Sequence, residues 1–180
     1  MATAMVYKVH EPTRAMEMIH PTDIPKEKAI TYASMVCDVR PLRQEQYRCC
    51  LVVGGDKQPY ASDSTAPAAN LIEFKILFNS VISTKGAKFM IIDISNFFLS
   101  SKMNNPEYMK IHQDDIPQDI LHQYKAHQFQ DKRGFVYFKI TKGMYGLKQA
   151  AILAYNQLKE NLSKHWQSPI PHTVGMWRHN

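Results

Sequence analysis

The chain has 180 residues, of which 44% are hydrophobic and 21% are charged, and its formal net charge is +6 at pH 7. This apolar content is enough for a core, so the composition excludes a fully disordered chain, and the length suits one domain or one and a half. The moderate positive charge is compatible with a polyanionic partner, although many ordinary enzymes share it.

The cysteine pattern and the absence of long apolar runs bear on location. The three cysteines, Cys37, Cys49 and Cys50, show no CxxC metal spacing, and their odd number favours a reducing compartment. The first 20 residues lack the apolar core of a signal peptide, and no apolar run approaches the length of a membrane span. We therefore expect a soluble, intracellular protein without a membrane partner.

The N-terminal third predicts an arm followed by a hairpin. Residues 1–28 contain three prolines and are expected to form a surface arm leading into a domain at 29–180. Residues 29–39 and 48–56 have the β-branched and aromatic content of strands, and a polar connector lies between them. These two runs predict an antiparallel hairpin, followed by a loop at 57–70.

The middle of the chain predicts a helix, two strands and a further helix. Residues 71–83 place apolar side chains on one helical face, namely Leu71, Phe74, Leu77, Phe78 and Val81. The run "AKFMIIDI" at 87–94 predicts a buried strand, and 105–112 predicts a shorter one. Residues 114–129 predict a helix that starts near Pro117.

The C-terminal part predicts a half-buried strand at 134–141, a long helix at 146–166 and an irregular tail. Strands and helices therefore mix without regular β-α-β alternation. This order favours the α+β class, with helices packed on one face of a mainly antiparallel sheet.

Asp93 directly follows the apolar run at 89–92, which raises the question of its role. An acid at the end of a buried strand can project into a cleft, and a strand end holds it rigidly enough for a cation such as Mg²⁺. The structural alternative is an aspartate that caps a helix or stabilises a turn. Asp93 by itself does not decide between them.

Three motifs occur in order: "DISNFFL" at 93–99, "EYM" at 107–109 and "GMYGLKQ" at 143–149. With the hairpin segment, they resemble the reverse transcriptase domain of Ty1/copia-type retrotransposons, over residues 29–178. The resemblance implies the fingers and palm of a right-hand polymerase. It also implies RNA-directed DNA synthesis by two-metal nucleotidyl transfer with Mg²⁺ or Mn²⁺.

The resemblance assigns Asp93 as the first catalytic carboxylate and as a metal ligand, with the carbonyl of Ile94 as a further ligand. It places Phe98 beneath the sugar of the incoming nucleotide, where a ring leaves no room for a 2′-hydroxyl. Gln149 would contact the same nucleotide. Taken without the resemblance, Phe98 fits a core residue and Gln149 an ordinary polar residue in the first helical turn.

Basic residues near the hairpin are expected to grip the triphosphate. Arg48 matches such a position, and Lys57 is a weaker candidate, although an exposed strand arginine is usually only solvated. Cys50 stands where the family carries a second basic residue, and a thiol cannot make charge-assisted hydrogen bonds to phosphate. We therefore expect weakened triphosphate binding.

The family's second metal motif, an aromatic-x-Asp-Asp hairpin, is absent from these 180 residues. The pair Asp114-Asp115 lies at a predicted strand-to-helix junction and fits helix capping. We therefore expect that this chain alone does not polymerise. The implied partners are an RNA or DNA template-primer, a deoxynucleotide and the rest of a polyprotein with thumb and RNase H regions, in the cytoplasm. The alternatives are a non-catalytic nucleic-acid-binding module and a non-functional remnant.

Overall fold

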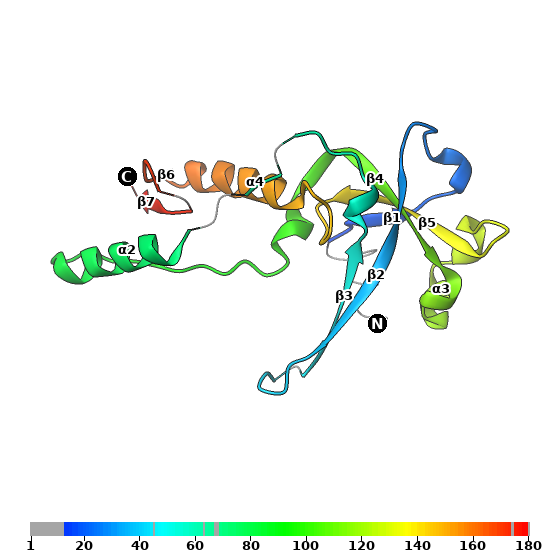
Figure 1. Ribbon diagram of the computed structural model, residues 1–180, viewed down its shortest axis with the longest axis horizontal. Helices are drawn as coiled ribbons and strands as arrows, with labels where there is room; N and C mark the ends of the chain where they lie inside the picture. The colour runs from blue at the N-terminus through cyan, green and yellow to red at the C-terminus, as the bar shows by residue number, and fades with distance from the viewer. Residues whose placement is uncertain (1–12, 45, 63, 67–68, 174, 180) are drawn as a thin grey trace.

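The computed structural model describes residues 13–44, 46–62, 64–66, 69–173 and 175–179 (Figure 1). Its main sheet has the strand order β1-β5-β4-β2-β3. The strands are β1 (Met16–Met18), β2 (Ile30–Val39), β3 (Tyr47–Val53), β4 (Lys102–His112) and β5 (Phe135–Lys142). Only the β2–β4 pairing is parallel, so the mainly antiparallel sheet and the α+β class are confirmed.

Three α-helices accompany the sheet in the described part of the chain: α2 (Leu71–Ser83), α3 (Gln118–Gln123) and α4 (Ala150–Lys164). Helices α2 and α4 project away from the sheet (Figure 1). Helix α2 buries no residue, and α4 buries only Ala150 and Ala154. The expected packing of helices against the sheet is therefore wrong for α2 and for most of α4, while Ile120 of α3 joins the core. No described helix has the length and apolar character needed to cross a membrane.

The hydrophobic core lies on the strands of the main sheet. In β5, Val136, Phe138 and Ile140 alternate into the main cluster, together with Met16 and Met109 from the flanking strands. Tyr137 points to the opposite face, where it forms a smaller cluster with Ile24 and Tyr108. The predicted strand at 134–141 is therefore confirmed, but it is buried on both faces at its centre.

The expected surface arm is corrected for the residues that the structure describes. Met16 to Met18 pair with β5 as the edge strand β1, and Ala15 and Met16 are fully buried in the main cluster. The short helix η1 (Pro21–Asp23) follows, and Ile24 enters the smaller cluster. The apolar residues of this segment reach the core because β5 offers an open edge. Residues 1–12 of the expected arm lie outside the described residues.

The predicted hairpin is confirmed as β2 and β3, which pair from Ala33 with Val53 to Val39 with Tyr47. Its register sets Cys37 directly opposite Cys49 with a Cα–Cα distance of 4.1 Å, and the two form a disulfide. Cys50 is a free thiol. The sequence pattern had favoured reduced cysteines, and it gave no sign of this pairing because the register depends on the loop between the strands.

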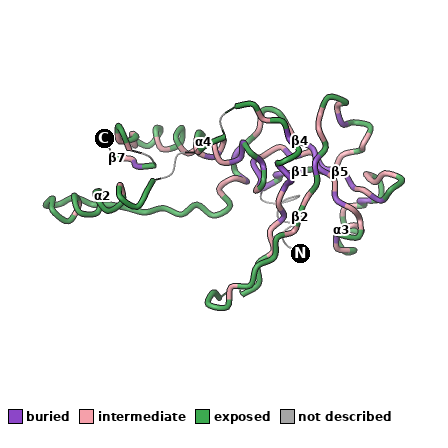
Figure 2. The backbone as a smooth tube through the Cα atoms, viewed as in Figure 1, coloured by how far each residue is buried: buried purple, intermediate pink, exposed green. Residues whose placement is uncertain are grey.

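Helix α2 forms over the predicted residues. Asn70 and Glu73 make reciprocal hydrogen bonds that cap its first turn, with 2.9 Å from the Glu73 amide to the Asn70 side chain. The apolar face expected to be buried nevertheless stays largely open to solvent (Figure 2). Local capping and periodicity specify this helix, while the described residues supply no layer that covers it.

The predicted buried strand at 87–94 is wrong. These residues form no strand and are all exposed, as Figure 2 shows for the segment that follows α2. Strand β4 is paired with β5 on one side and β2 on the other, so the centre of the sheet has no free edge for this run. Within this run, Phe89 contacts the ring of Phe78 in α2, with ring centroids 5.4 Å apart.

The helix predicted at 114–129 is shorter than expected. The turn η4 (Gln113–Asp115) precedes α3, which ends before Lys125, a residue in the left-handed region with φ 50°. The turn η5 (Ala126–Phe129) follows. Asp114 and Asp115 belong to η4, and the cap position of α3 is Pro117, so the expected capping of this helix by the two aspartates is corrected.

The tail expected to be irregular instead contains a two-stranded ribbon. Strands β6 (Gln167–Pro169) and β7 (Trp177–His179) pair antiparallel directly after α4. The other predicted elements at 105–112 and 146–166 are confirmed, as β4 and as α4 with a later start.

The carboxylate of Asp131 stabilises the turn that leads into β5. Its carboxylate accepts hydrogen bonds from the Phe135 amide at 3.0 Å, the Tyr137 hydroxyl at 2.9 Å and the Arg133 amide at 2.9 Å. The Phe135 amide leads the donors that lower the pKa of Asp131 below its usual 3.8. The contribution to stability is therefore present above pH 3.8 and is lost as the pH falls through the lowered pKa.

We expect Asp131→Asn to lower the Tm at pH 7, because the neutral amide weakens these charge-assisted hydrogen bonds; each 1 kcal/mol lost corresponds to roughly 2–4 °C. The gap from the wild type should shrink as the pH falls below 3.8. Thermal melts across this range check it, with the exposed Asp115→Asn as control. A gap that stays constant with pH would mean that the carboxylate charge is not its source.

Candidate functional site

The segment 143–149 connects two parts of the fold. The amide of Gly143 donates to the carbonyl of Ser101 at 2.8 Å, and the amide of Val53 donates to the carbonyl of Tyr145 at 2.8 Å. The segment thus lies between the end of β3 and the turn η3 (Phe97–Ser100). It then leads into α4 and fixes where that helix begins.

Phe98 is half-buried in η3 and contacts this segment. Its ring meets the ring of Tyr145 edge-on, with centroids 5.0 Å apart. A Cβ on Gly143 would lie 2.7 Å from the carbonyl oxygen of Phe98, so the backbones approach at a distance that only glycine allows. Two of the three sequence motifs, at 93–99 and 143–149, are therefore in direct contact.

Gln149 is 7% exposed and occupies the cap position of α4. Its side-chain amide donates to one oxygen of Glu107 at 3.1 Å, and the amide of Gln58 donates to the other at 3.3 Å. The ammonium of Lys148 donates to the backbone carbonyl of Gln58 at 3.0 Å. Glu107 belongs to the third motif, at 107–109, so the segment 143–149 contacts both of the other motifs.

The two glutamines each present an oxygen that the described residues leave unsatisfied. Oε1 of Gln58 and Oε1 of Gln149 are buried and have no hydrogen-bond partner among those residues. A buried acceptor without a donor costs on the order of 1–3 kcal/mol, so such atoms are suited to accept from a ligand hydroxyl or amine. We refer to Gln58, Glu107 and Gln149 below as the glutamine–glutamate cluster.

Sequence reasoning named Gln149 but missed Gln58 and Glu107 as members of this cluster, and it missed Lys148, which bonds to Gln58. The only local signal was the acid of the "EYM" motif, standing among apolar strand residues. Gln58 lies 49 residues from Glu107 in the chain, in a segment predicted as loop. Nothing in the local pattern joins the two.

Asp93 and Ile94 lie in the exposed stretch before η3, so the predicted position of Asp93 at the end of a buried strand is wrong. Asn96, in the left-handed region with φ 54°, separates this stretch from η3. The described residues contain no group of three or more His, Cys, Asp or Glu side chains at metal-binding distances. A pair of Mg²⁺ ions needs several oxygen ligands each, and Asp93 with one carbonyl does not fit that requirement.

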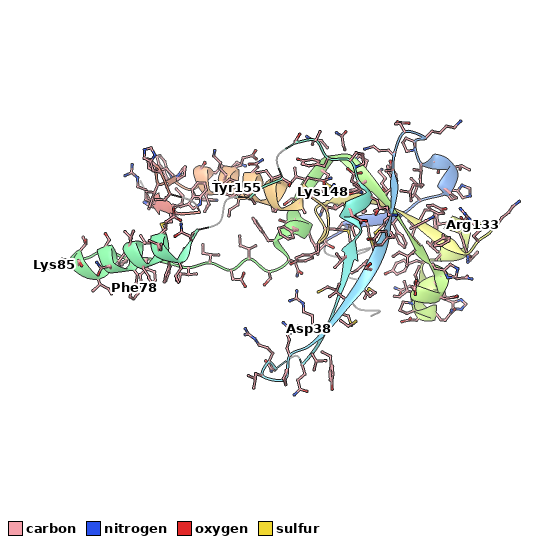
Figure 3. All side chains as sticks on the ribbon, viewed as in Figure 1. Asp38, Phe78, Lys85, Arg133, Lys148 and Tyr155 are labelled. Atoms are coloured by element: carbon pink, nitrogen blue, oxygen red, sulfur yellow. A yellow bond between two sulfur atoms is a disulfide. The ribbon has the colours of Figure 1, made fainter. Side chains whose placement is uncertain are left out.

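The two basic candidates occupy different places. Arg48 pairs with Asp38 across the hairpin, and Figure 3 shows Asp38 on the part that projects from the sheet. Lys57 is exposed in the turn η2 (Gly55–Lys57), directly before Gln58. Lys57 is therefore the sequence neighbour of a member of the glutamine–glutamate cluster, whereas Arg48 lies on the hairpin. Cys50 pairs with Val36 on the same hairpin.

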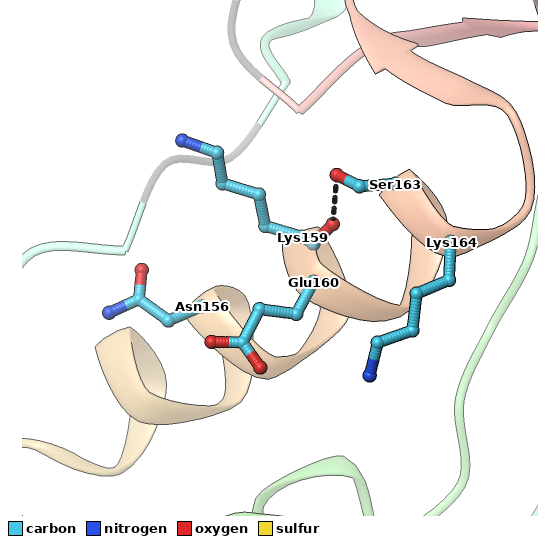
Figure 4. A pocket seen from close by; sticks show the side chains of 5 residues that line it. All are labelled: Asn156, Lys159, Glu160, Ser163 and Lys164. Carbon is cyan, nitrogen blue, oxygen red and sulfur yellow. Dashed lines mark hydrogen bonds between the residues drawn. The ribbon is translucent and has the colours of Figure 1, made fainter.

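A hollow lies along one face of α4 (Figure 4). Its lining consists of five side chains from this one helix: Asn156, Lys159, Glu160, Ser163 and Lys164. The Ser163 hydroxyl donates back to the Lys159 carbonyl at 2.8 Å, as serines in helices often do. None of the site residues predicted from the sequence lines this hollow.

Comparisons of the chain with protein-family models, with curated proteins and with solved structures give no match.

Proposed function

We propose that this chain is the fingers and palm portion of an RNA-directed DNA polymerase of the Ty1/copia type. The observation that carries the proposal is that the segment 143–149 contacts both other motifs, through Tyr145 to Phe98 and through Gln149 to Glu107. These motifs lie apart in the sequence, and nothing in their local patterns requires them to touch. The projecting β2–β3 hairpin corresponds to the fingers in this proposal.

The chemistry around the cluster suits a deoxynucleotide. The Phe98 ring offers a flat apolar surface for a sugar, and the free oxygens of Gln58 and Gln149 can accept hydrogen bonds from a base or a hydroxyl. The N-terminus of α4 lacks a side-chain cap, and the positive end of its helix dipole favours phosphate. The exposed Lys57 adds a positive charge nearby in the chain.

Polymerisation by these 180 residues alone is not part of the proposal. Among the described residues, no group of His, Cys, Asp or Glu side chains is suited to hold the Mg²⁺ or Mn²⁺ ions that the reaction uses. Asp93 remains the proposed contribution of this chain to that metal site. The proposed partners are the rest of the polyprotein and a template-primer, and the proposed location is the cytoplasm.

The test compares two adjacent, half-buried phenylalanines. We expect Phe98→Ala to reduce the preference for dUTP over UTP by on the order of tenfold, about 1.4 kcal/mol, because the ring no longer excludes the 2′-hydroxyl. Phe97→Ala should leave this preference unchanged. Equilibrium titration with both nucleotides gives the ratio of the two Kd values, and a ratio is insensitive to partial unfolding.

Two outcomes would contradict the proposal. The first is a wild-type chain that binds neither nucleotide, and the second is an equal effect of both alanine variants. A primer-extension assay with Mg²⁺ or Mn²⁺ forms a separate arm. Template-dependent incorporation that disappears in Asp93→Ala would show that the chain is catalytic on its own, against our expectation.

A second candidate function is a non-catalytic nucleic-acid-binding module. It is favoured by the exposed side chains of Arg43, Tyr47 and Arg48, which give the projecting hairpin both positive charge and a stacking surface. Steep salt dependence of oligonucleotide affinity, together with no discrimination between dUTP and UTP, would favour this function over the first.

A further inference from the structure

We propose that residues 88–93, "KFMIID", form a self-association segment that pairs antiparallel with the same segment of a second copy of this chain. The inference goes beyond the proposed function and does not depend on it. It rests on the exposure of this segment, on its unused strand-forming character and on the position of its two charges.

The centre of the segment is apolar and open to solvent. Phe89, Met90, Ile91 and Ile92 are between 45% and 78% exposed, and none of them belongs to a strand. Bulky, β-branched runs of this length have a high tendency to pair edge to edge when nothing covers them. The main sheet cannot take the run at its centre, where every strand already has two neighbours.

The charges identify the second copy as the occupant. Lys88 and Asp93 stand at the two ends of four apolar residues, and both are exposed. In an antiparallel pairing, Lys88 lies opposite Asp93 of the second copy, and Asp93 lies opposite its Lys88. Phe89 then faces Ile92, and Met90 faces Ile91, so every one of the six positions meets a compatible side chain.

Other arrangements of the same two segments lose this match. Parallel pairing in register sets Lys88 against Lys88 and Asp93 against Asp93, which is repulsive. An antiparallel shift by one residue sets Asp93 against Phe89 and leaves Lys88 without an acidic partner. The charges therefore favour one register, in the way that side-chain pattern specifies register in ordinary sheets.

The neighbouring helix α2 is also exposed and apolar, and its Phe78 touches Phe89. It provides a competing explanation, in which two copies associate through helical faces. That contact would not depend on the signs of residues 88 and 93. Pairing through the segment also withdraws the Asp93 carboxylate from solvent, so the two explanations differ in what they do to this residue.

The test uses charge reversal in the full chain and measures mass by sedimentation at several concentrations. We expect the wild type to associate above its monomer mass of 20.8 kDa. Lys88→Asp and Asp93→Lys should each weaken self-association by on the order of tenfold or more, because both end pairs become repulsive. An equimolar mixture of the two variants should restore association, and so should the double variant Lys88→Asp with Asp93→Lys.

Lys85→Asp is the matched control, because it makes the same charge change at an exposed residue outside the segment. It should associate like the wild type. A wild type that stays monomeric at all concentrations would overturn the proposal. Association that is equally strong in all charge variants would overturn it too, in favour of the α2 surface. Mass is read without any nucleotide, so failure here is distinct from failure of the proposed function.

Discussion

Gly146→Ala should destabilise the fold strongly, by about 2–5 kcal/mol, from a backbone cost of about 1–2 and an overpacking cost of about 1–3. Gly146 has φ +95°, which side-chain-bearing residues rarely adopt. A Cβ at this position would also lie 1.9 Å from the carbonyl oxygen of Val53, which is backbone and cannot rotate away. The substitution therefore forces apart the end of β3 and the segment that leads into α4.

Two other glycines separate the backbone cost from the cost of the close contact. Gly86 has φ +80° but open space around its Cβ position, so Gly86→Ala measures the backbone cost alone. Gly55 has no positive φ, yet its Cβ would lie 2.0 Å from the carbonyl oxygen of Gly146, so Gly55→Ala measures the contact alone. Urea denaturation of the three variants should rank Gly146 above both. Equal losses for Gly86→Ala and Gly146→Ala would show that close approach contributes nothing.

The predictable parts of the fold are those specified by neighbouring residues. The hairpin β2–β3 follows from two strand-like runs around a polar connector, and α2 follows from Asn70, Glu73 and a helical period. Both were predicted with nearly the observed bounds. In these cases, a stretch of about 20 residues or fewer contains the hydrogen bonds and the apolar pattern that stabilise the element.

The mispredicted parts depend on partners far away in the chain. Residues 87–94 read as a buried strand, but a strand also needs a free sheet edge, and the order of the main sheet leaves none at its centre. Strand β1 shows the opposite case. Its three residues carry too little pattern to predict a strand, and β5, more than 100 residues later, provides the pairing.

The candidate site also contains residues that the sequence predicted and residues that it did not. The resemblance brought Phe98 and Gln149 to attention, and the structure joins their motifs through Tyr145 and Glu107. Gln58 was not predicted, because its side-chain hydrogen bond to Glu107 joins two elements of different type. Arg48 had a plausible residue type for phosphate, but the register places it opposite Asp38 on the hairpin. Residue type predicts chemistry, while position depends on pairing.

Two isoleucines give the sharpest comparison between sequence pattern and structure. Ile140 of β5 is 0% exposed and Ile91 is 70% exposed, although the pattern around Ile140 predicts a half-buried strand and that around Ile91 a buried one. We expect Ile140→Ala to cost about 2–5 kcal/mol, because it leaves a cavity between β1 and β4. Ile91→Ala should stay within about 0.5 kcal/mol, because the side chain is already in water.

The comparison holds the chemistry constant, since both variants remove the same atoms from the same type of residue. Denaturant unfolding at low protein concentration keeps any self-association of residues 88–93 out of the measurement. A loss at Ile91 as large as that at Ile140 would mean that the run at 87–94 is covered in solution, as its sequence pattern predicts. A loss confined to Ile140 would leave that run free to pair with a second copy.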